Sequence, residues 1–338
     1  MDRTESSLGE GVAAMFAEQG GLVRAGQLEL YGVDAKARRR WCRTRSLLRV
    51  RPGIYCLPSE WDRRKPWERY ELQVRAVALR GIPSGSRHRA ISHASAAVLW
   101  ELPVYGRQVE VHVTSAGGRV RRDPVGVRTH HSLLVDAVTE IDGIPVTTLP
   151  RTIIDCCRAH SFVTGVAVAD AGLRLLLDQQ GVAPGDRKLA QETHREMLIA
   201  ELDRRRLRGA TQARKAIAFS DGRSESIAET RARIGFRAVG LPAPTPQFTV
   251  RTGIGTFYPD FVFEDYGVAV EIDGDQKYTE LYTSDPFRTV QAERRRHNAI
   301  QEVGWEIVRV TWDDLKDPVG IKRRIVMARK RARPRGIA

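Results

Sequence analysis

The stretch that decides the fold lies near the C-terminus, where residues 258–263 read YPDFVF and residues 268–274 read VAVEIDG. Both segments contain short apolar runs, and the four residues between them, EDYG, are typical of a tight turn. The pattern predicts two adjacent strands, the second of them fully buried. Asp260 stands near the start of the first strand, whereas Glu271 and Asp273 end the second.

Carboxylates at the end of a buried strand need compensation, because burying an isolated ionised group is costly. Hard oxygen ligands of this kind are those that Mg²⁺ prefers in proteins. We therefore expect Asp260 and Glu271 to bind Mg²⁺, with Asp273 as a further candidate ligand. A Mg²⁺ ion held in this way can activate water for phosphodiester hydrolysis.

The charge of the chain favours a polyanionic partner. Its 338 residues carry 55 basic and 41 acidic side chains, which gives a net charge of +14. Eight basic side chains and no acid lie within residues 35–51, and the same is true of residues 322–338. Clustered positive charge is typical of nucleic-acid-binding proteins, although an arginine-rich surface can also be simply solvated.

The sequence predicts a cytoplasmic protein with no membrane partner. Its first residues, MDRTESSLGEGVAAMF, do not resemble a signal peptide, and no apolar run approaches ~20 residues. Cys42, Cys56, Cys156 and Cys157 form no CxxC pair, so we expect reduced thiols rather than disulfides or a zinc site. The length predicts more than one domain.

Residues 1–60 are predicted to form a winged helix-turn-helix domain, with three short helices followed by a hairpin at residues 47–57. In that fold the third helix, residues 35–44, enters the major groove and the hairpin touches the DNA backbone. The residues predicted to contact DNA are Lys36, Arg38, Arg39, Arg40, Arg43, Arg49 and Arg51. A small helical unit of this kind could instead bind another protein, and Trp41 is expected to pack in its core.

Several motifs lie in the first half of the chain: GLVRAGQL at residues 21–28, LRVRPGIY at 48–55, ISHASAAVLW at 91–100 and IPVTTLPRTIID at 144–155. This half resembles the AbiEi-type antitoxins. The resemblance implies a transcriptional autorepressor of a type IV toxin–antitoxin system, with DNA and a cognate toxin protein as partners. Because this N-terminal half occurs with different C-terminal modules, it implies the architecture more than the antitoxin role.

The segment from about residue 220 is expected to run helix, three strands, helix, strand, helix. Glu229 lies on the first helix, the three acids of the strand pair follow, and RVTW stands at residues 309–312. This segment resembles the Vsr-like branch of the PD-(D/E)XK nuclease fold. The resemblance implies a Mg²⁺-dependent endonuclease in which Asp260 and Glu271 ligate the metal and Glu229 completes the ligand set or orients the attacking water.

Two positions depart from that family's pattern. Asp273 stands where a lysine usually follows the acidic ligand, and Lys277 stands where a histidine often occurs. We expect Lys277 to supply the missing positive charge. The candidate catalytic residues are therefore Glu229, Asp260, Glu271, Asp273 and Lys277. The alternative is an inactive nuclease fold retained for DNA binding, in which Asp273 only caps a turn.

The predicted fold class is a multidomain α/β (α+β) protein. After the first domain we expect an α/β middle domain at residues 61–160 and a helical connector at 161–219. The nuclease-fold domain with its basic tail would then span residues 220–338. Arg151 and Asp155, four residues apart at a helix start, predict an ion pair.

Four histidines of the middle domain could suggest a metal site: His93, His112, His130 and His131. Their spacings match no zinc pattern, so we expect structural hydrogen bonding rather than a metal site.

Two functions compete at this point. The retained carboxylates favour a Mg²⁺-dependent endonuclease targeted by a winged helix. The N-terminal resemblance favours a repressor or antitoxin whose nuclease fold is inactive. The sequence leaves the DNA site and the oligomeric state open.

Overall fold

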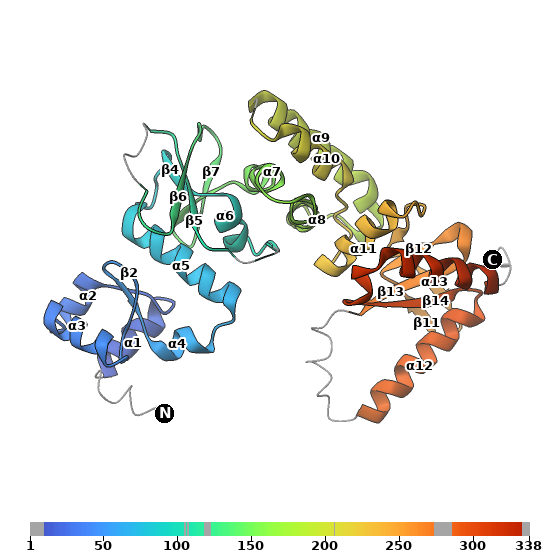
Figure 1. The fold of residues 1–338 in the computed structure, drawn as a ribbon, viewed down its shortest axis with the longest axis horizontal. Coiled ribbons are helices and arrows are strands. Elements are labelled where there is room, and N and C mark those ends of the chain that lie inside the picture. The colour runs from blue at the N-terminus through green and yellow to red at the C-terminus, as the bar shows by residue number, and fades with distance from the viewer. Residues whose placement is uncertain are drawn as a thin grey trace. The chain divides into compact units, whose positions relative to one another are not determined.

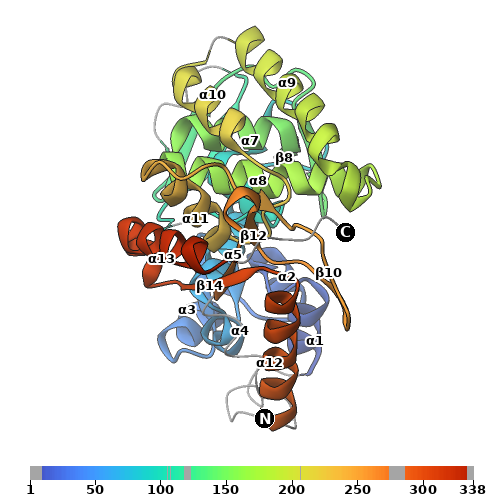
Figure 2. The same ribbon diagram turned by 90° about the vertical axis from the view of Figure 1, so that its right-hand side faces the viewer.

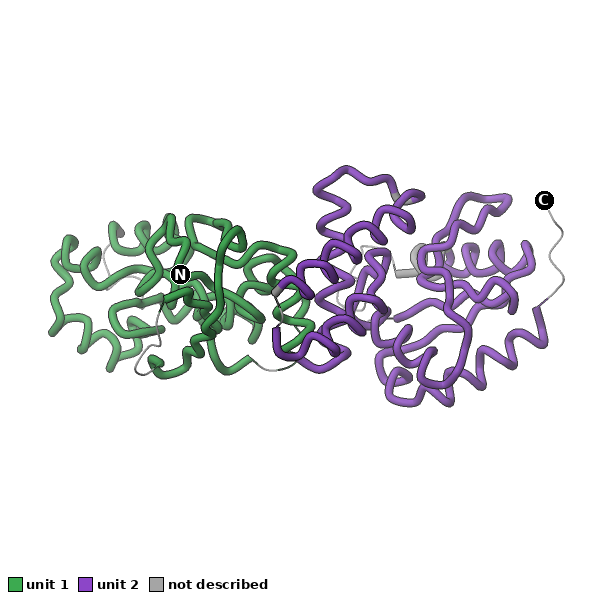
Figure 3. The backbone as a smooth tube through the Cα atoms, turned by 90° about the horizontal axis from the view of Figure 1, so that it is seen from above, with its two compact units in different colours: residues 1–159 green, residues 160–338 purple. Residues whose placement is uncertain are grey.

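The computed structural model describes residues 10–104, 106, 108–117, 123–205, 207–273 and 286–332. The chain is a mixed α/β protein, as predicted, and it divides into two compact units, Met1–Ala159 and His160–Ala338 (Figure 3). No helix within the described ranges is long and apolar enough to cross a membrane. All four cysteines are free.

Unit 1 begins with three helices and a small antiparallel sheet (Figure 1). These elements are α1 (Glu10–Glu18), β1 (Val23–Arg24), α2 (Ala25–Leu30), α3 (Ala35–Arg43), β2 (Leu48–Arg51) and β3 (Ile54–Cys56). Asp34 caps α3 by accepting a hydrogen bond from the Ala37 amide at 2.7 Å. Trp41 packs against the core beneath these helices, as predicted.

The rest of unit 1 is a five-stranded sheet with helices against it. Its elements are α4 (Pro58–Arg63), α5 (Pro66–Gly81), β4 (Arg89–Ile91), α6 (His93–Leu99), β5 (Val111–Ser115), β6 (Val127–His131), β7 (Val138–Ile141), β8 (Ile144–Thr147) and α7 (Leu149–Ala159). The strand order is β6-β5-β4-β8-β7, with β5 parallel to β6 and β4 parallel to β8. Leu72 and Ala76 of α5 share an apolar core with Ile54 and Cys56 of β3, so one core spans both parts of the unit.

The predicted ion pair of α7 is present and buried. Arg151 Nε donates to Asp155 Oδ2 at 2.8 Å, and Arg158 donates to Asp155 Oδ1 at the same distance. Asp155 is fully buried and Arg151 is 2% exposed. Two charge-assisted hydrogen bonds therefore offset the cost of burying this carboxylate.

Unit 2 opens with three helices that pack on one another: α8 (Phe162–Gln179), α9 (Arg187–Arg205) and α10 (Ala210–Phe219). A four-stranded sheet with helices on both faces follows. Its elements are α11 (Ile227–Ala238), β9 (Thr245–Pro246), β10 (Val250–Thr252), β11 (Gly255–Phe257), β12 (Phe261–Phe263), β13 (Val268–Asp273), α12 (Pro286–Glu302), β14 (Glu306–Thr311) and α13 (Pro318–Arg331).

The order in this sheet is β14-β13-β12-β9, and β10 and β11 form a separate hairpin. β12 pairs antiparallel with β13 across the turn at residues 264–267, which confirms the strand pair predicted from the sequence. β13 and β14 run parallel, with α12 between them in the sequence.

Alternation along β13 assigns its side chains to two faces. Val268, Val270 and Ile272 join the core formed with α11 and α13. Ala269 joins the opposite core, which contains Ile300 of α12. α12 and α13 thus cover different faces of the sheet (Figures 1 and 2). Glu271 lies on the α12 face.

A buried carboxylate connects the helices of unit 2 to its sheet. Asp170 of α8 accepts hydrogen bonds from the Asp221 amide at 2.7 Å, from Thr230 Oγ1 at 2.6 Å and from Arg233 at 2.6 Å. Asp170 is 2% exposed, and Thr230 and Arg233 both belong to α11. These bonds fix the position of α11 against α8.

We expect Asp170→Ala to lower the free energy of unfolding by about 3–5 kcal/mol, because Arg233 would stay buried without its carboxylate. Chemical denaturation followed by circular dichroism measures the change. The matched control is Asp178→Ala on the same helix, where Asp178 is 47% exposed and pairs with Arg187. The control should cost at most about 1 kcal/mol. Equal losses in the two variants would contradict the role given to Asp170.

Candidate functional site

The two acids predicted to bind Mg²⁺ lie at the same end of the β12–β13 pair. Phe261 pairs with Val270, and continuing that register places Asp260 opposite Glu271. Asp260 Oδ2 accepts a hydrogen bond from the Ile272 amide at 2.6 Å. This bond holds the Asp260 carboxylate against the end of β13, where the sheet no longer satisfies that amide.

Glu229 lies in the first turn of α11 and is 5% exposed. Ser226 caps the helix: its hydroxyl accepts from the Glu229 amide at 3.1 Å and donates to Glu229 Oε1 at 2.9 Å. The Glu225 amide donates to Oε2 at 2.9 Å. Burial is the main cause that raises the pKa of Glu229 to about 7, and the negative charge of Asp260 contributes to that rise. The two carboxylates are therefore electrostatically coupled.

Glu271 lies beside two arginines that the sequence did not identify, one of which, Arg309, also pairs with Glu293 at 2.6 Å. Arg296 of α12 lies 2.9 Å from Glu271 Oε1, and Arg309 of β14 lies 3.7 Å from Oε2. Arg309 is the cross-strand neighbour of Glu271 in the parallel register of β13 and β14. The Glu271 side chain is 15% exposed, so these contacts lie in a partly desolvated setting.

The other two predicted catalytic residues are Asp273 and Lys277. Asp273 ends β13 opposite Thr311 and is half-buried. Lys277 lies outside the described residues. Glu229, Asp260, Glu271 and Asp273 do not provide three carboxylate oxygens that all lie within 4.8 Å of one another, a criterion applied to the described residues.

The exposed face of α3 is strongly basic. Lys36, Arg39, Arg40 and Arg43 are all exposed and recur at the spacing of one helical face. Arg49 of β2 is exposed as well. Within the described part of the chain, none of these five forms an ion pair with an acid, so their charge is available to a partner.

Two of the arginines predicted to contact DNA have other partners. Arg38 is 7% exposed and donates to the Val33 carbonyl and to Glu29 Oε1, both at 2.8 Å. The prediction that Arg38 faces DNA is therefore wrong, because the inward side of α3 buries it.

Arg51 donates to the carbonyl oxygens of Val125 and Gly126 at 2.6 and 3.1 Å. Its guanidinium is used within unit 1, which corrects the prediction of a DNA backbone contact. Burial lowers the pKa of Arg51, and the charge of Arg80 adds to that effect.

Three of the four histidines meet in unit 1, although their spacings gave no sign of it. His112 Nδ1 lies 2.9 Å from His130 Nε2, and the ring of His93 stacks on that of His130 with centroids 3.7 Å apart. His131 is exposed. The expected hydrogen bonding is present, and the side chains also form a cluster that the sequence did not predict.

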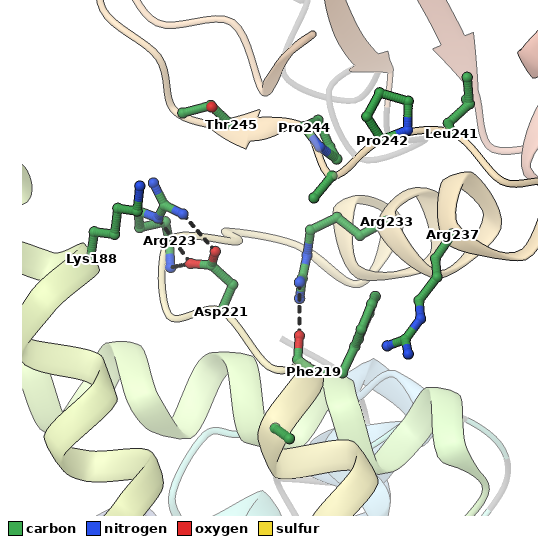
Figure 4. Close-up of a pocket in the computed structure, with 12 residues that line it drawn as sticks. Lys188, Phe219, Asp221, Arg223, Arg233, Arg237, Leu241, Pro242, Pro244 and Thr245 are labelled. Carbon is green, nitrogen blue, oxygen red and sulfur yellow. Dashed lines mark hydrogen bonds and ion pairs between the residues drawn. The ribbon is translucent and has the colours of Figure 1, made fainter. Parts of the chain in front are cut away.

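A cavity of about 540 Å³ lies in unit 2, beside α11 (Figure 4). Two of its cations are committed to other groups: Arg223 binds Asp221 at 2.8 Å, and Arg233 donates to the Phe219 carbonyl at 3.0 Å. Lys188 and Arg237 also line it and are exposed. None of the candidate carboxylates lines this cavity.

No family model matches the chain. Two proteins of Mycobacterium tuberculosis are similar to it: the uncharacterized protein MT2308 of strain CDC 1551 / Oshkosh and the uncharacterized protein Rv2248 of strain ATCC 25618 / H37Rv. Each is 27% identical over 250 residues, which cover 72% of this chain and 84% of the relative. Neither name states an activity.

Glu229→Gln should remove a pH dependence of stability. The pKa of Glu229 rises from 4.5 to about 7 on folding, so its stabilising contribution is complete below pH 4.5 and is lost as the pH rises through 7. The free energy of unfolding of the wild type should fall by about 3 kcal/mol relative to the variant across that window. Denaturation curves at several pH values measure this, with the exposed Glu302→Gln of the same unit as control. A constant difference between wild type and Glu229→Gln would refute the prediction.

Proposed function

We propose that this protein binds DNA through α3 and cleaves phosphodiester bonds with Mg²⁺ at the carboxylates of unit 2. The observation that carries the proposal is the placement of Asp260 and Glu271 at one end of the β12–β13 pair, with Glu229 of α11 electrostatically coupled to Asp260. Asp260 faces Glu271 across the β12–β13 pair, and Glu229 interacts with Asp260 from α11. Like charges gathered at a partly buried site are typical of functional centres that bind a cation.

The order of elements supports the same proposal. A helix carrying an acid precedes two antiparallel strands, and a helix then connects β13 to the parallel strand β14. This is the order expected for the Vsr-like PD-(D/E)XK nuclease fold, in which the acids hold the metal.

The donors at this site fit Mg²⁺ in their chemistry, because all are carboxylate oxygens. Asp260 and Glu271 would hold the ion, with Asp273 as a further ligand and Glu229 as a ligand or a water-orienting group. The metal would supply polarisation of a phosphate oxygen and activation of water. Arg296 and Arg309 place positive charge beside Glu271, where a DNA phosphate needs it. Lys277 remains a candidate for the same task.

The basic face of α3 supports DNA binding. Three helices followed by the β2–β3 hairpin match the order of a winged helix-turn-helix, with α3 in the place of the recognition helix. Lys36, Arg39, Arg40 and Arg43 would face DNA, and Arg49 would contact the backbone from the hairpin. Arg38 would instead hold α3 to α2 through Glu29.

A second candidate function is a transcriptional autorepressor or antitoxin of the AbiEi type, with an inactive nuclease fold and a toxin protein as a further partner. The ion pairs of Glu271 with Arg296 and Arg309 favour it, because they neutralise the acid without a metal. Asp273 in the position of a catalytic lysine favours it too.

Nicking of supercoiled plasmid tests the nuclease. We expect Mg²⁺- or Mn²⁺-dependent nicking that Glu271→Ala lowers by about 100-fold or more, since even loss of an outer-shell group costs up to about that much. Asp265→Ala is the matched control, because Asp265 is an exposed acid in the turn between the same two strands. If the wild type binds DNA but nicks it no faster with metal than Glu271→Ala does, the nuclease proposal is rejected. The repressor function would then be the one supported.

Fluorescence anisotropy with duplex DNA tests the binding face. Arg39→Ala and Arg43→Ala should each weaken binding and reduce the slope of log K against log salt by about 1, because each loses a phosphate contact. Arg63→Ala, which removes an exposed ion pair with Glu60 outside α3, should leave the slope unchanged. The same salt slope in all three variants would exclude α3 as the DNA-binding face.

A further inference from the structure

The histidine cluster of unit 1 is assembled from three separate elements. His93 begins α6, His112 lies on β5 and His130 lies on β6. In the parallel register His112 pairs with Arg128 and Thr114 with His130, so the two strand histidines share one face of the sheet. One ring nitrogen from each of the three histidines lies within 4.8 Å of the other two.

The separation of the ring nitrogens is close to that of histidine nitrogens bound to one metal ion. Nitrogens bound to one tetrahedral zinc ion at about 2.1 Å lie about 3.4 Å apart. His112 Nδ1 and His130 Nε2 are 2.9 Å apart, so a small opening of this pair would admit the ion. His93 Nδ1 lies 3.0 Å from Ser92 Oγ, which leaves its Nε2 for a metal.

We propose that His93, His112 and His130 bind a divalent transition metal ion of the zinc type. The ring of His93 has to tilt out of its stack on His130, because a nitrogen lone pair lies in the plane of its ring. The other two ring pairs are already wide enough, with centroids 5.2 and 5.7 Å apart.

The charges around the cluster select the kind of metal. Asp155 Oδ2 lies 3.9 Å from His93 Nδ1, but this carboxylate is held by Arg151 and Arg158. Hard ions such as Mg²⁺ need carboxylate ligands, whereas imidazole suits zinc and its neighbours. Asp155 and Ser92 instead act on His93 from behind, as the outer partners of metal-binding histidines do.

Two further features of the histidine cluster support a binding site. His93 has a φ of 53°, a left-handed conformation that is uncommon for residues other than glycine and clusters at functional sites. The Thr114 hydroxyl, opposite His130, is buried with no hydrogen-bond partner among the described residues. A buried hydroxyl without a partner indicates that the cluster can take in another polar species.

Three histidines leave one tetrahedral position open, which is the pattern of metal sites that bind water or a ligand rather than of closed structural sites. His112 and His130 are half-buried, so solvent can reach the open position. The proposal is independent of the carboxylates in unit 2.

Cobalt binding to the full chain, stripped with a chelator, tests the proposal. One equivalent of Co²⁺ should give a visible absorption band that Zn²⁺ abolishes and Mg²⁺ does not. His112→Gln and His130→Gln should weaken binding at least 100-fold. His131→Ala, which removes the exposed neighbour of His130, and Glu271→Ala should leave it unchanged. Equal Co²⁺ affinity in His112→Gln and His131→Ala would overturn the site.

A measurement on the wild type alone keeps the test valid if the variants fail to fold. One equivalent of Zn²⁺ should shift the ring ¹⁵N signals of three of the eight histidines in an NMR spectrum. No shift, or shifts confined to other histidines, would overturn the proposal.

Discussion

The hydrogen bonds of Asp170 are the interaction on which the second unit depends. This carboxylate accepts from α11 through Thr230 and Arg233, and from the chain before that helix through the Asp221 amide. Burial raises the pKa of Asp170, while Arg233 and the other donors oppose that shift. Glu229 is the residue beside Thr230, so the position of the candidate site is set by a contact with α8.

Buried arginines connect secondary-structure elements at several places in the chain. The planar guanidinium can bind several acceptors at once, which suits it to connecting buried elements. Arg38 joins α3 to α2, Arg151 joins α7 to the loop after β6 through the Leu133 carbonyl, and Arg233 joins α11 to α8. The count of 55 basic side chains therefore overstates the positive charge that is free for a nucleic acid.

Features set by local sequence could be predicted. The β12–β13 pair follows from two apolar runs and one turn, the cap of α3 from Asp34, and the Arg151–Asp155 pair from helical spacing. Arg38 is buried because of its position around the helix: Trp41, three residues later, faces the same core. Applying the 3.6-residue period to α3 would have placed Arg38 on the buried face and Arg39 on the exposed face.

Long-range contacts could not be predicted in this way. Arg309 faces Glu271 only because β13 and β14 pair in one particular parallel register, which the sequence does not specify. The histidine cluster depends on the same kind of register between β5 and β6, and on a helix start that comes earlier in the chain. Spacing rules for zinc sites describe short loops and helices, so they do not detect ligands gathered by a sheet.

The contacts of Arg51 tie the N-terminal helices to the rest of unit 1. Its guanidinium ties the hairpin to carbonyl oxygens more than seventy residues later, and a shared core continues under the same hairpin. A hinge motion near residue 60 would have to break the Arg51 hydrogen bonds and separate the shared core. The smallest fragment that keeps α3 in its native surroundings therefore ends near Ala159, and the hairpin is part of a stiff body rather than a free arm.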